Sequence, residues 1–112
     1  MEIHEEQNDK VGLAKDYWGM GIVLKKMGKH REALDSYNKA LKIDEELNDR
    51  LGMANIHYNI SLVLSKTSKD EALKHLNNAL TILQEFEREN GYRHPLTEKV
   101  NSRISYLKEE TQ

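Results

Sequence analysis

The sequence contains two copies of one motif, and this internal repeat is the feature that most restricts the fold. Residues 3–14 align with residues 43–54 at an offset of 40, with Ile, Glu, Glu, Asn, Asp, Gly and Ala at the same places. Further along the chain, Ala33, Ala40, Leu41 and Ile43 recur as Ala72, Ala79, Leu80 and Ile82 at an offset of 39. A repeat of this length is typical of stacked supersecondary units, each of which buries its apolar face against the next.

Apolar residues recur at three- and four-residue spacing through most of the chain, which predicts amphipathic helices. The predicted helices span about 10–27, 30–47, 51–66, 69–90 and from Pro95 onward. Residues 2–8 then form the end of a helix whose beginning is missing. The chain is either a piece of a longer array or a short array with a frayed start. We expect an all-α domain in which 1–9 is the remnant of a preceding helix, 10–48 and 49–91 are two repeats, and 94–110 is a capping helix.

Residues that typically start or end helices lie between the periodic segments. Asp9 and Ser68 are predicted N-caps, because their side-chain oxygens can accept an unpaired backbone amide. Gly28 and Gly91 are predicted to end helices in the left-handed conformation, which glycine adopts without steric cost. Pro95 suits the first position of a helix, where no amide donor is needed.

The apolar stripes of the predicted helices define a core. Gly21 lies on the stripe of the first helix, where a missing side chain lets a partner helix approach closely, whereas Gly19 has no evident packing role. His57 takes the place of Tyr17 in the second copy, which predicts a packed or half-buried histidine. The full predicted core is Tyr17, Met20, Gly21, Leu24, Ala33, Tyr37, Ala40, Ile60, Leu64, Ala72, Leu76, Ala79 and Leu80.

Composition excludes several classes of function. The net charge of −2 gives no electrostatic reason to expect binding to nucleic acid, and the absence of cysteine excludes disulfides and thiolate metal sites. No apolar run approaches the roughly 20 residues that span a bilayer, so no membrane association is expected. The acidic N-terminal residues lack the pattern of a signal peptide. We therefore expect a soluble cytoplasmic protein.

No catalytic or ligand-binding motif is present. Of the five histidines, no two are four residues apart, and the chain has neither a phosphate-binding loop nor a zinc-binding HExxH motif. Gly19-Met20-Gly21 lies inside a predicted helix and is not followed by the rest of a dinucleotide fingerprint. We therefore predict no catalytic residue, no metal and no cofactor.

The first copy resembles the tetratricopeptide repeat family, through Tyr17-x-x-Met20-Gly21-x-x-Leu24, Gly28 and Ala33-x-x-x-Tyr37. The second copy carries His57, Ile60, Ser61 and Leu64, followed by Ala72, Leu76 and Ala79. The period of about 40 residues resembles the longer-period type. Gly91-Tyr92-Arg93-His94-Pro95 is similar to the joint between repeats in kinesin light chain-like members. The resemblance implies antiparallel helix-turn-helix repeats stacked as a short right-handed superhelix, with a concave groove that binds peptides or proteins.

The predicted partner-binding surface lies on the first and third helices, beside their packing faces. Trp18 and Tyr58 are its predicted anchors, although they could instead complete a wide packing face. The full predicted set is Lys15, Trp18, Ile22, Asn55, Tyr58, Asn59, Leu62 and Lys66. The main hypothesis is a non-catalytic interaction module that binds a peptide or a helix of a partner protein. The alternatives are a self-assembly module of a larger scaffold or regulatory protein, with a homodimer as one form, and an enzyme.

Overall fold

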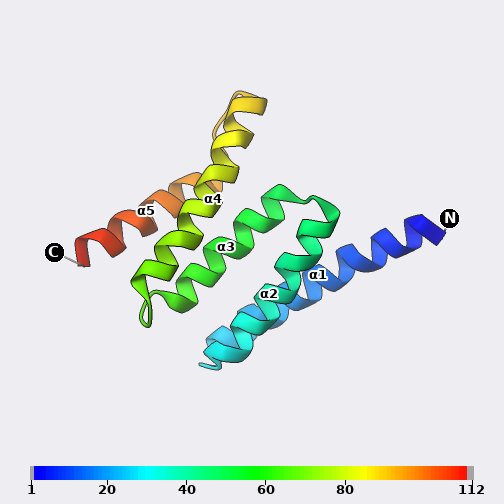
Figure 1. Cartoon of the computed structure of the whole chain (residues 1–112), viewed down its shortest axis with the longest axis horizontal. Helices are drawn as coiled ribbons and strands as arrows, with labels where there is room; N and C mark the ends of the chain where they lie inside the picture. Colours follow the sequence, from blue (N-terminus) through cyan, green and yellow to red (C-terminus); the bar gives the residue numbers. More distant parts are fainter. Residues whose placement is uncertain (1, 111–112) are drawn as a thin grey trace. The chain divides into compact units, whose positions relative to one another are not determined.

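The protein is all-α over the part that the structure describes. A computed structural model describes the backbone of residues 2–110 and the side chains of residues 9–109. Its helices are α1 (Glu2–Lys26), α2 (His30–Leu47), α3 (Arg50–Leu64), α4 (Lys69–Asn90) and α5 (Pro95–Glu110). Figure 1 shows these five helices in chain order, and no strand occurs among the described residues. The predicted all-α fold class is confirmed.

The chain divides into two compact units, and the division falls within α3 between Ile56 and His57. The first unit holds α1, α2 and the start of α3. The second holds the rest of α3 together with α4 and α5.

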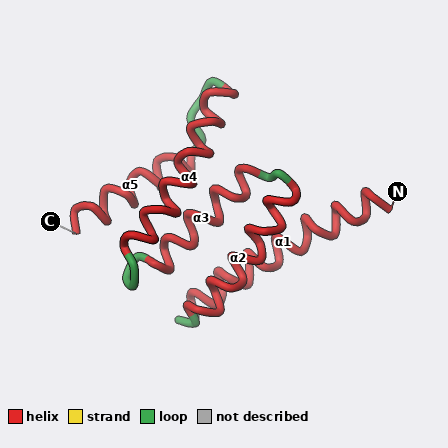
Figure 2. Tube along the Cα trace, viewed as in Figure 1, coloured by secondary structure: helices red, strands yellow, loops and turns green. Residues whose placement is uncertain are grey.

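Short loops of the first unit end their helices with left-handed residues (Figure 2). Gly28 has a φ of 80°, and the amide of the following Lys29 donates to the Leu24 carbonyl at 2.9 Å. Asn48 has a φ of 55°, and the amide of Asp49 donates to the Asp44 carbonyl at 2.9 Å. Both loops therefore satisfy otherwise unpaired carbonyls at a helix end. The predicted role of Gly28 is confirmed.

The predicted helix start at Asp9 was wrong. Helix α1 runs without a break from Glu2 to Lys26, so Asp9 lies inside it. The matching residues of the second copy, Asn48 and Asp49, do form a helix boundary. The chain turns there through the left-handed Asn48, which brings Gly52 at the start of α3 close to Asp44 on α2. Whether residues 1–9 belong to a preceding repeat stays a prediction.

The first unit packs α1 closely against α2 through Gly21. A Cβ atom added at Gly21 would lie only 2.5 Å from Cε1 of Tyr37, a ring that is 0% exposed. Ala33 and Ala40 are also fully buried. The predicted packing role of Gly21 is therefore confirmed, because no other residue leaves room for the tyrosine ring.

Part of the predicted α1 core was wrong. Met20 is 51% exposed. Tyr17 and Leu24 are half-buried. The reason is geometric: successive helix positions differ by about 100°, and the residue directed at α2 is Gly21.

The second unit has a core built from α3, α4 and α5. Its predicted core residues Ile60, Ala72, Leu76 and Ala79 are buried, whereas Leu64 and Leu80 are half-buried. Large core side chains that were not in the predicted core set are Leu83, Val100 and Leu107, each 0% exposed.

The helix ends of the second unit match the predictions. The Ser68 hydroxyl accepts from the Glu71 amide at 3.4 Å and caps α4. Gly91 ends that helix with a φ of 79°, and Pro95 opens α5. Within the described part of the chain, no helix is both long and apolar enough to cross a membrane.

Candidate functional site

The eight predicted partner-binding residues are divided between the two units. Lys15, Trp18, Ile22 and Asn55 belong to the first unit, and Tyr58, Asn59, Leu62 and Lys66 belong to the second. Three of the eight side chains are exposed, namely Lys15, Asn55 and Lys66. The other five are half-buried. These residues stay a predicted site.

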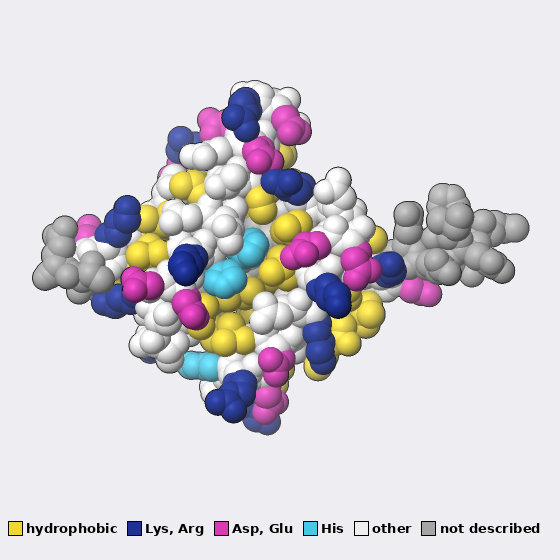
Figure 3. All heavy atoms as spheres, in the orientation of Figure 1, with side chains coloured by type: hydrophobic (Ala, Val, Ile, Leu, Met, Phe, Trp, Pro, Cys, Tyr) yellow, Lys and Arg dark blue, Asp and Glu magenta, His cyan; other side chains and the backbone are white. Residues whose placement is uncertain are grey.

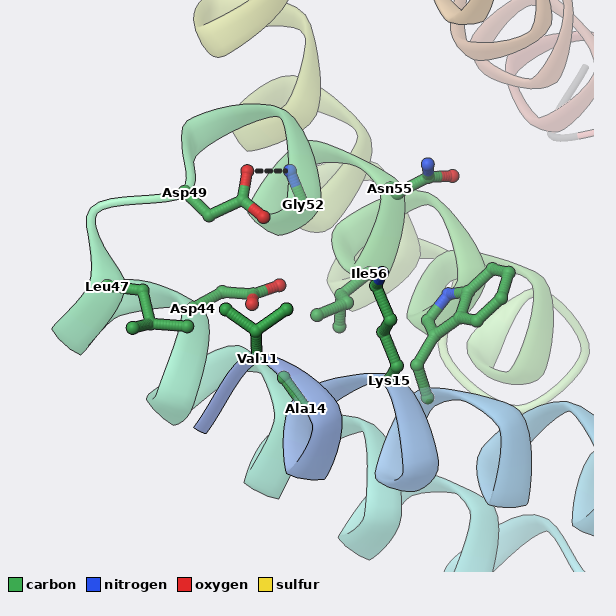
Figure 4. A pocket seen from close by; sticks show the side chains of 10 residues that line it. Val11, Ala14, Lys15, Asp44, Leu47, Asp49, Gly52, Asn55 and Ile56 are labelled. Atoms are coloured by element: carbon green, nitrogen blue, oxygen red, sulfur yellow. Dashed lines mark hydrogen bonds between the residues drawn. The ribbon is translucent and has the colours of Figure 1, made fainter. Parts of the chain in front are cut away.

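The first unit contains a depression of about 220 Å³ between α1, the end of α2 and the start of α3. We call this depression the α2–α3 pocket (Figure 4). It gathers three of the predicted residues, whereas Ile22 does not line it. The lining residues are Val11, Ala14, Lys15, Trp18, Asp44, Leu47, Asp49, Gly52, Asn55 and Ile56.

Asp44 is the buried charge of this pocket. It is only 7% exposed, and Figure 4 shows its carboxylate directed from α2 into the space between Val11 and Gly52. Burial raises the pKa of Asp44 to about 6, and the nearby Asp49 carboxylate adds to the effect. Both causes disfavour the charged form of Asp44.

Asp49 and Gly52 form the opposite wall. The Gly52 amide donates to Oδ1 of Asp49 at 2.9 Å, so Asp49 caps the start of α3. A Cβ atom at position 52 would lie 2.6 Å from Oδ2 of Asp44 and also 2.6 Å from Oδ2 of Asp49. Two carboxylates thus approach the same glycine, and a side chain there would push them away.

Hydrogen-bond donors, one of them cationic, also line the pocket. The Nε1–H group of Trp18 is buried and has no acceptor among the described residues. Lys15 on α1 is the one cationic residue of the lining set. Nearby, Lys10 pairs with Glu46 at 3.1 Å, so this exposed cation already has a partner.

In the second unit, Tyr58 lies in a shallow depression of about 340 Å³ against α5. The Arg103 guanidinium lies 4.8 Å from the centre of the Tyr106 ring there, at cation–π distance. The lining residues are Tyr58, Glu98, Lys99, Ser102, Arg103 and Tyr106. This depression therefore combines aromatic surface with charges of both signs.

A histidine pair lies between α3 and α4, with His57 buried and His75 half-buried. The Nδ1 atoms of His57 and His75 are 2.9 Å apart, so one nitrogen donates and the other accepts. Burial lowers the pKa of His57 to about 4, with a contribution from His75, and burial also lowers the pKa of His75. The predicted packed histidine at position 57 is confirmed. The described side chains contain no group of three or more metal-ligating residues.

Because the pKa values of His57 and His75 are lowered in the folded protein, we expect the protein to lose stability in mild acid. The unfolded chain binds protons on these histidines near pH 6.5, whereas folded His57 resists protonation down to about pH 4. Stability from the pair is therefore full above pH 6.5 and falls as the pH drops toward 4, by about 1–2 kcal/mol. Urea unfolding at pH 7 and pH 4.5 checks this. The drop should be smaller in His57→Leu, and an equal drop in both proteins would contradict it.

The pocket contains residues that the sequence analysis did not select. Asp44, Asp49 and Gly52 are the main ones. One signal could have found Asp44: it continues the buried stripe of α2 beyond Tyr37 and Ala40, at helical spacing. A charged residue on an apolar stripe is informative, because an unpaired buried charge is costly.

Helix pairs that pack through glycine and alanine, in two copies of one motif, define an α-helical repeat protein. The tetratricopeptide repeat family matches residues 13–85, and the chain therefore belongs to that family. Comparison with curated proteins and with solved structures gave no match. Membership indicates a module that interacts with proteins or peptides, and repeats of this family are generally non-catalytic.

Proposed function

We propose that this domain binds an extended peptide or a helix of a partner protein, using the α2–α3 pocket as one contact. The observation that supports this most is the pocket itself, where the predicted residues Lys15, Trp18 and Asn55 line one depression. On the face drawn in Figure 3, acidic and basic side chains are interspersed with apolar ones. Local shape and apolar contact, rather than one dominant charge, would then select the partner.

The predicted anchors are testable by truncation. Trp18→Ala and Tyr58→Ala should each weaken partner binding at least tenfold, because aromatic anchors dominate interface energetics. The domain should stay folded, since both side chains are half-buried rather than fully buried. Peptides selected from a random displayed library on the wild-type domain supply the ligand, and titration calorimetry measures each variant. If no peptide binds, or if both variants bind unchanged per folded molecule, the proposal fails.

Self-association is the second candidate function, and a separate surface supports it. Helix α1 and the turn that follows it expose large apolar side chains along one stripe, on the side away from the pocket. The stripe consists of Leu13, Met20, Val23 and Met27, which are 45%, 51%, 55% and 61% exposed. A second copy of this chain could cover that stripe, because exposed apolar rows often mark protein contacts.

Sedimentation over a range of concentrations separates the two candidates. Self-association through the stripe predicts a larger species that Met20→Lys abolishes and Trp18→Ala leaves unchanged. Groove binding predicts that Trp18→Ala abolishes the binding of an added peptide and that Met20→Lys leaves it unchanged. Each variant is thus the control for the other. A cytoplasmic location, which the sequence led us to expect, stays a prediction.

A further inference from the structure

Two polar groups of the α2–α3 pocket make no hydrogen bond to the other lining residues (Figure 4). One is the Asp44 carboxylate, which is 7% exposed and directed into the pocket. The other is the Nε1–H group of Trp18. An indole N–H can only donate, so it offers nothing to a cation, whereas the Asp44 carboxylate can accept from a donor that enters the pocket. Carboxylates this deeply buried are nearly always paired, so Asp44 points to a missing donor.

The charge balance of the pocket shows what kind of group is missing. Its lining carries the carboxylates of Asp44 and Asp49 but one ammonium group, that of Lys15. Asp44 also lies in the last turn of α2, which contains no basic residue. The carbonyl end of a helix is electronegative and ordinarily attracts a cation. The two carboxylates and the helix end favour a positive group at Asp44, and the single Lys15 ammonium does not balance them.

From these contacts we infer that the α2–α3 pocket receives the guanidinium group of an arginine side chain presented by the partner segment. This inference rests on the proposed function and names the partner's chemistry. The guanidinium would lie between the Asp44 and Asp49 carboxylates, over Gly52. The aliphatic part of the side chain would contact Val11 and Leu47, which line the same depression.

Arginine fits this pocket better than lysine for three reasons. Its planar fork of donors can reach two carboxylates at once, which a point charge cannot. It is more weakly hydrated than an ammonium group, so it enters a half-enclosed site more readily. It also stacks on aromatic faces, and the Trp18 indole lines the pocket.

Charged side chains on the elements around Asp44 affect the binding of the guanidinium group. Lys15 on α1 opposes an incoming cation, and Asp49 before α3 favours it. Lys10 on α1 is held by Glu46, the two atoms being 3.1 Å apart. Because the pKa of Asp44 is about 6, binding should weaken as the pH falls below 6 and this carboxylate takes up a proton.

The probe is N-acetyl-arginine amide, and N-acetyl-citrulline amide is its uncharged control of nearly equal shape. Two-dimensional NMR of the full chain follows the Gly52 amide and the Trp18 indole N–H. The arginine probe should shift both resonances with a Kd of about 1–10 mM, as expected for a single side chain. The citrulline probe should leave both in place. Equal shifts with the two probes would overturn the inference.

Three variants sharpen the test. Asp44→Asn should weaken binding of the arginine probe at least tenfold, yet raise the melting temperature by about 5 °C, because it removes an unpaired buried charge. Lys15→Met should strengthen binding two- to threefold by removing a competing cation. Gly52→Ala keeps both charges but separates the carboxylates, and should weaken binding as much as Asp44→Asn does. Unchanged binding in Asp44→Asn or Gly52→Ala would overturn the inference.

Failure of this inference and failure of the proposed function give different results. If library-selected peptides bind through Trp18 but tolerate replacement of every arginine by citrulline, the interaction module stands and the arginine assignment fails. If the arginine probe binds at Gly52 and Trp18 but no selected peptide binds, the pocket assignment stands and the proposed function fails.

Discussion

Replacing Gly21 with alanine is expected to destabilise the first unit by about 3 kcal/mol, the upper end of what overpacking a core costs. The added Cβ atom would lie 2.5 Å from Cε1 and 2.6 Å from Cδ1 of Tyr37. The ring cannot swing into solvent, because Tyr37 is 0% exposed and its ring lies against Gly21 of α1. The helices would have to separate instead, which would loosen contacts along their whole interface. Urea denaturation measures the change in the free energy of unfolding.

Gly19 provides the matched control, two residues earlier in the same helix. A Cβ atom at Gly19 would have no atom within 4 Å, so Gly19→Ala meets no obstacle. Alanine has the higher helix propensity, and this variant should be more stable by up to about 1 kcal/mol. The two identical substitutions should therefore have opposite signs. If both stabilise the protein, α1 and α2 do not pack through Gly21.

Periodicity was sufficient to predict much of the fold, because each helix buries one apolar stripe. The spacing of Ala33, Tyr37 and Ala40 predicted the buried face of α2, and all three are fully buried. Periodicity was less reliable in α1, where apolar residues occur on more than one side. Its stripe therefore did not distinguish Met20, which is exposed, from Gly21, which contacts Tyr37.

The pocket could be predicted only in part from the sequence. Resemblance to the repeat family placed Lys15, Trp18 and Asn55 on a partner-facing side, and the structure brings these three to one depression. Asp44 and Asp49 were not found, because their proximity depends on the left-handed turn at Asn48 and on the missing side chain of Gly52. A turn that joins two carboxylates leaves no periodic pattern. Its clue was a charged residue on an apolar stripe.

In the second unit, Leu76→Ala should lower the free energy of unfolding by about 2–5 kcal/mol, the second large effect that we expect. Leu76 is 0% exposed, so its truncation loses buried apolar contact and leaves a cavity that the surrounding helix packing closes only partly. Thermal and urea denaturation measure the loss. The cost should fall toward the lower limit only if Leu83, also 0% exposed, can move into the space.

Met20→Ala tests whether the exposure of a side chain, rather than its hydrophobicity, determines how much stability is lost when it is truncated to alanine. Methionine and leucine have similar volumes, and the sequence pattern placed both Met20 and Leu76 in the core. Met20 is nevertheless 51% exposed, so its truncation should change the free energy of unfolding by no more than about 0.5 kcal/mol. Both variants should be measured at concentrations where the chain is monomeric, since the Met20 stripe is the proposed self-association surface. Equal losses in the two variants would show that α1 is rotated from the orientation described here, with Met20 rather than Gly21 directed at Tyr37.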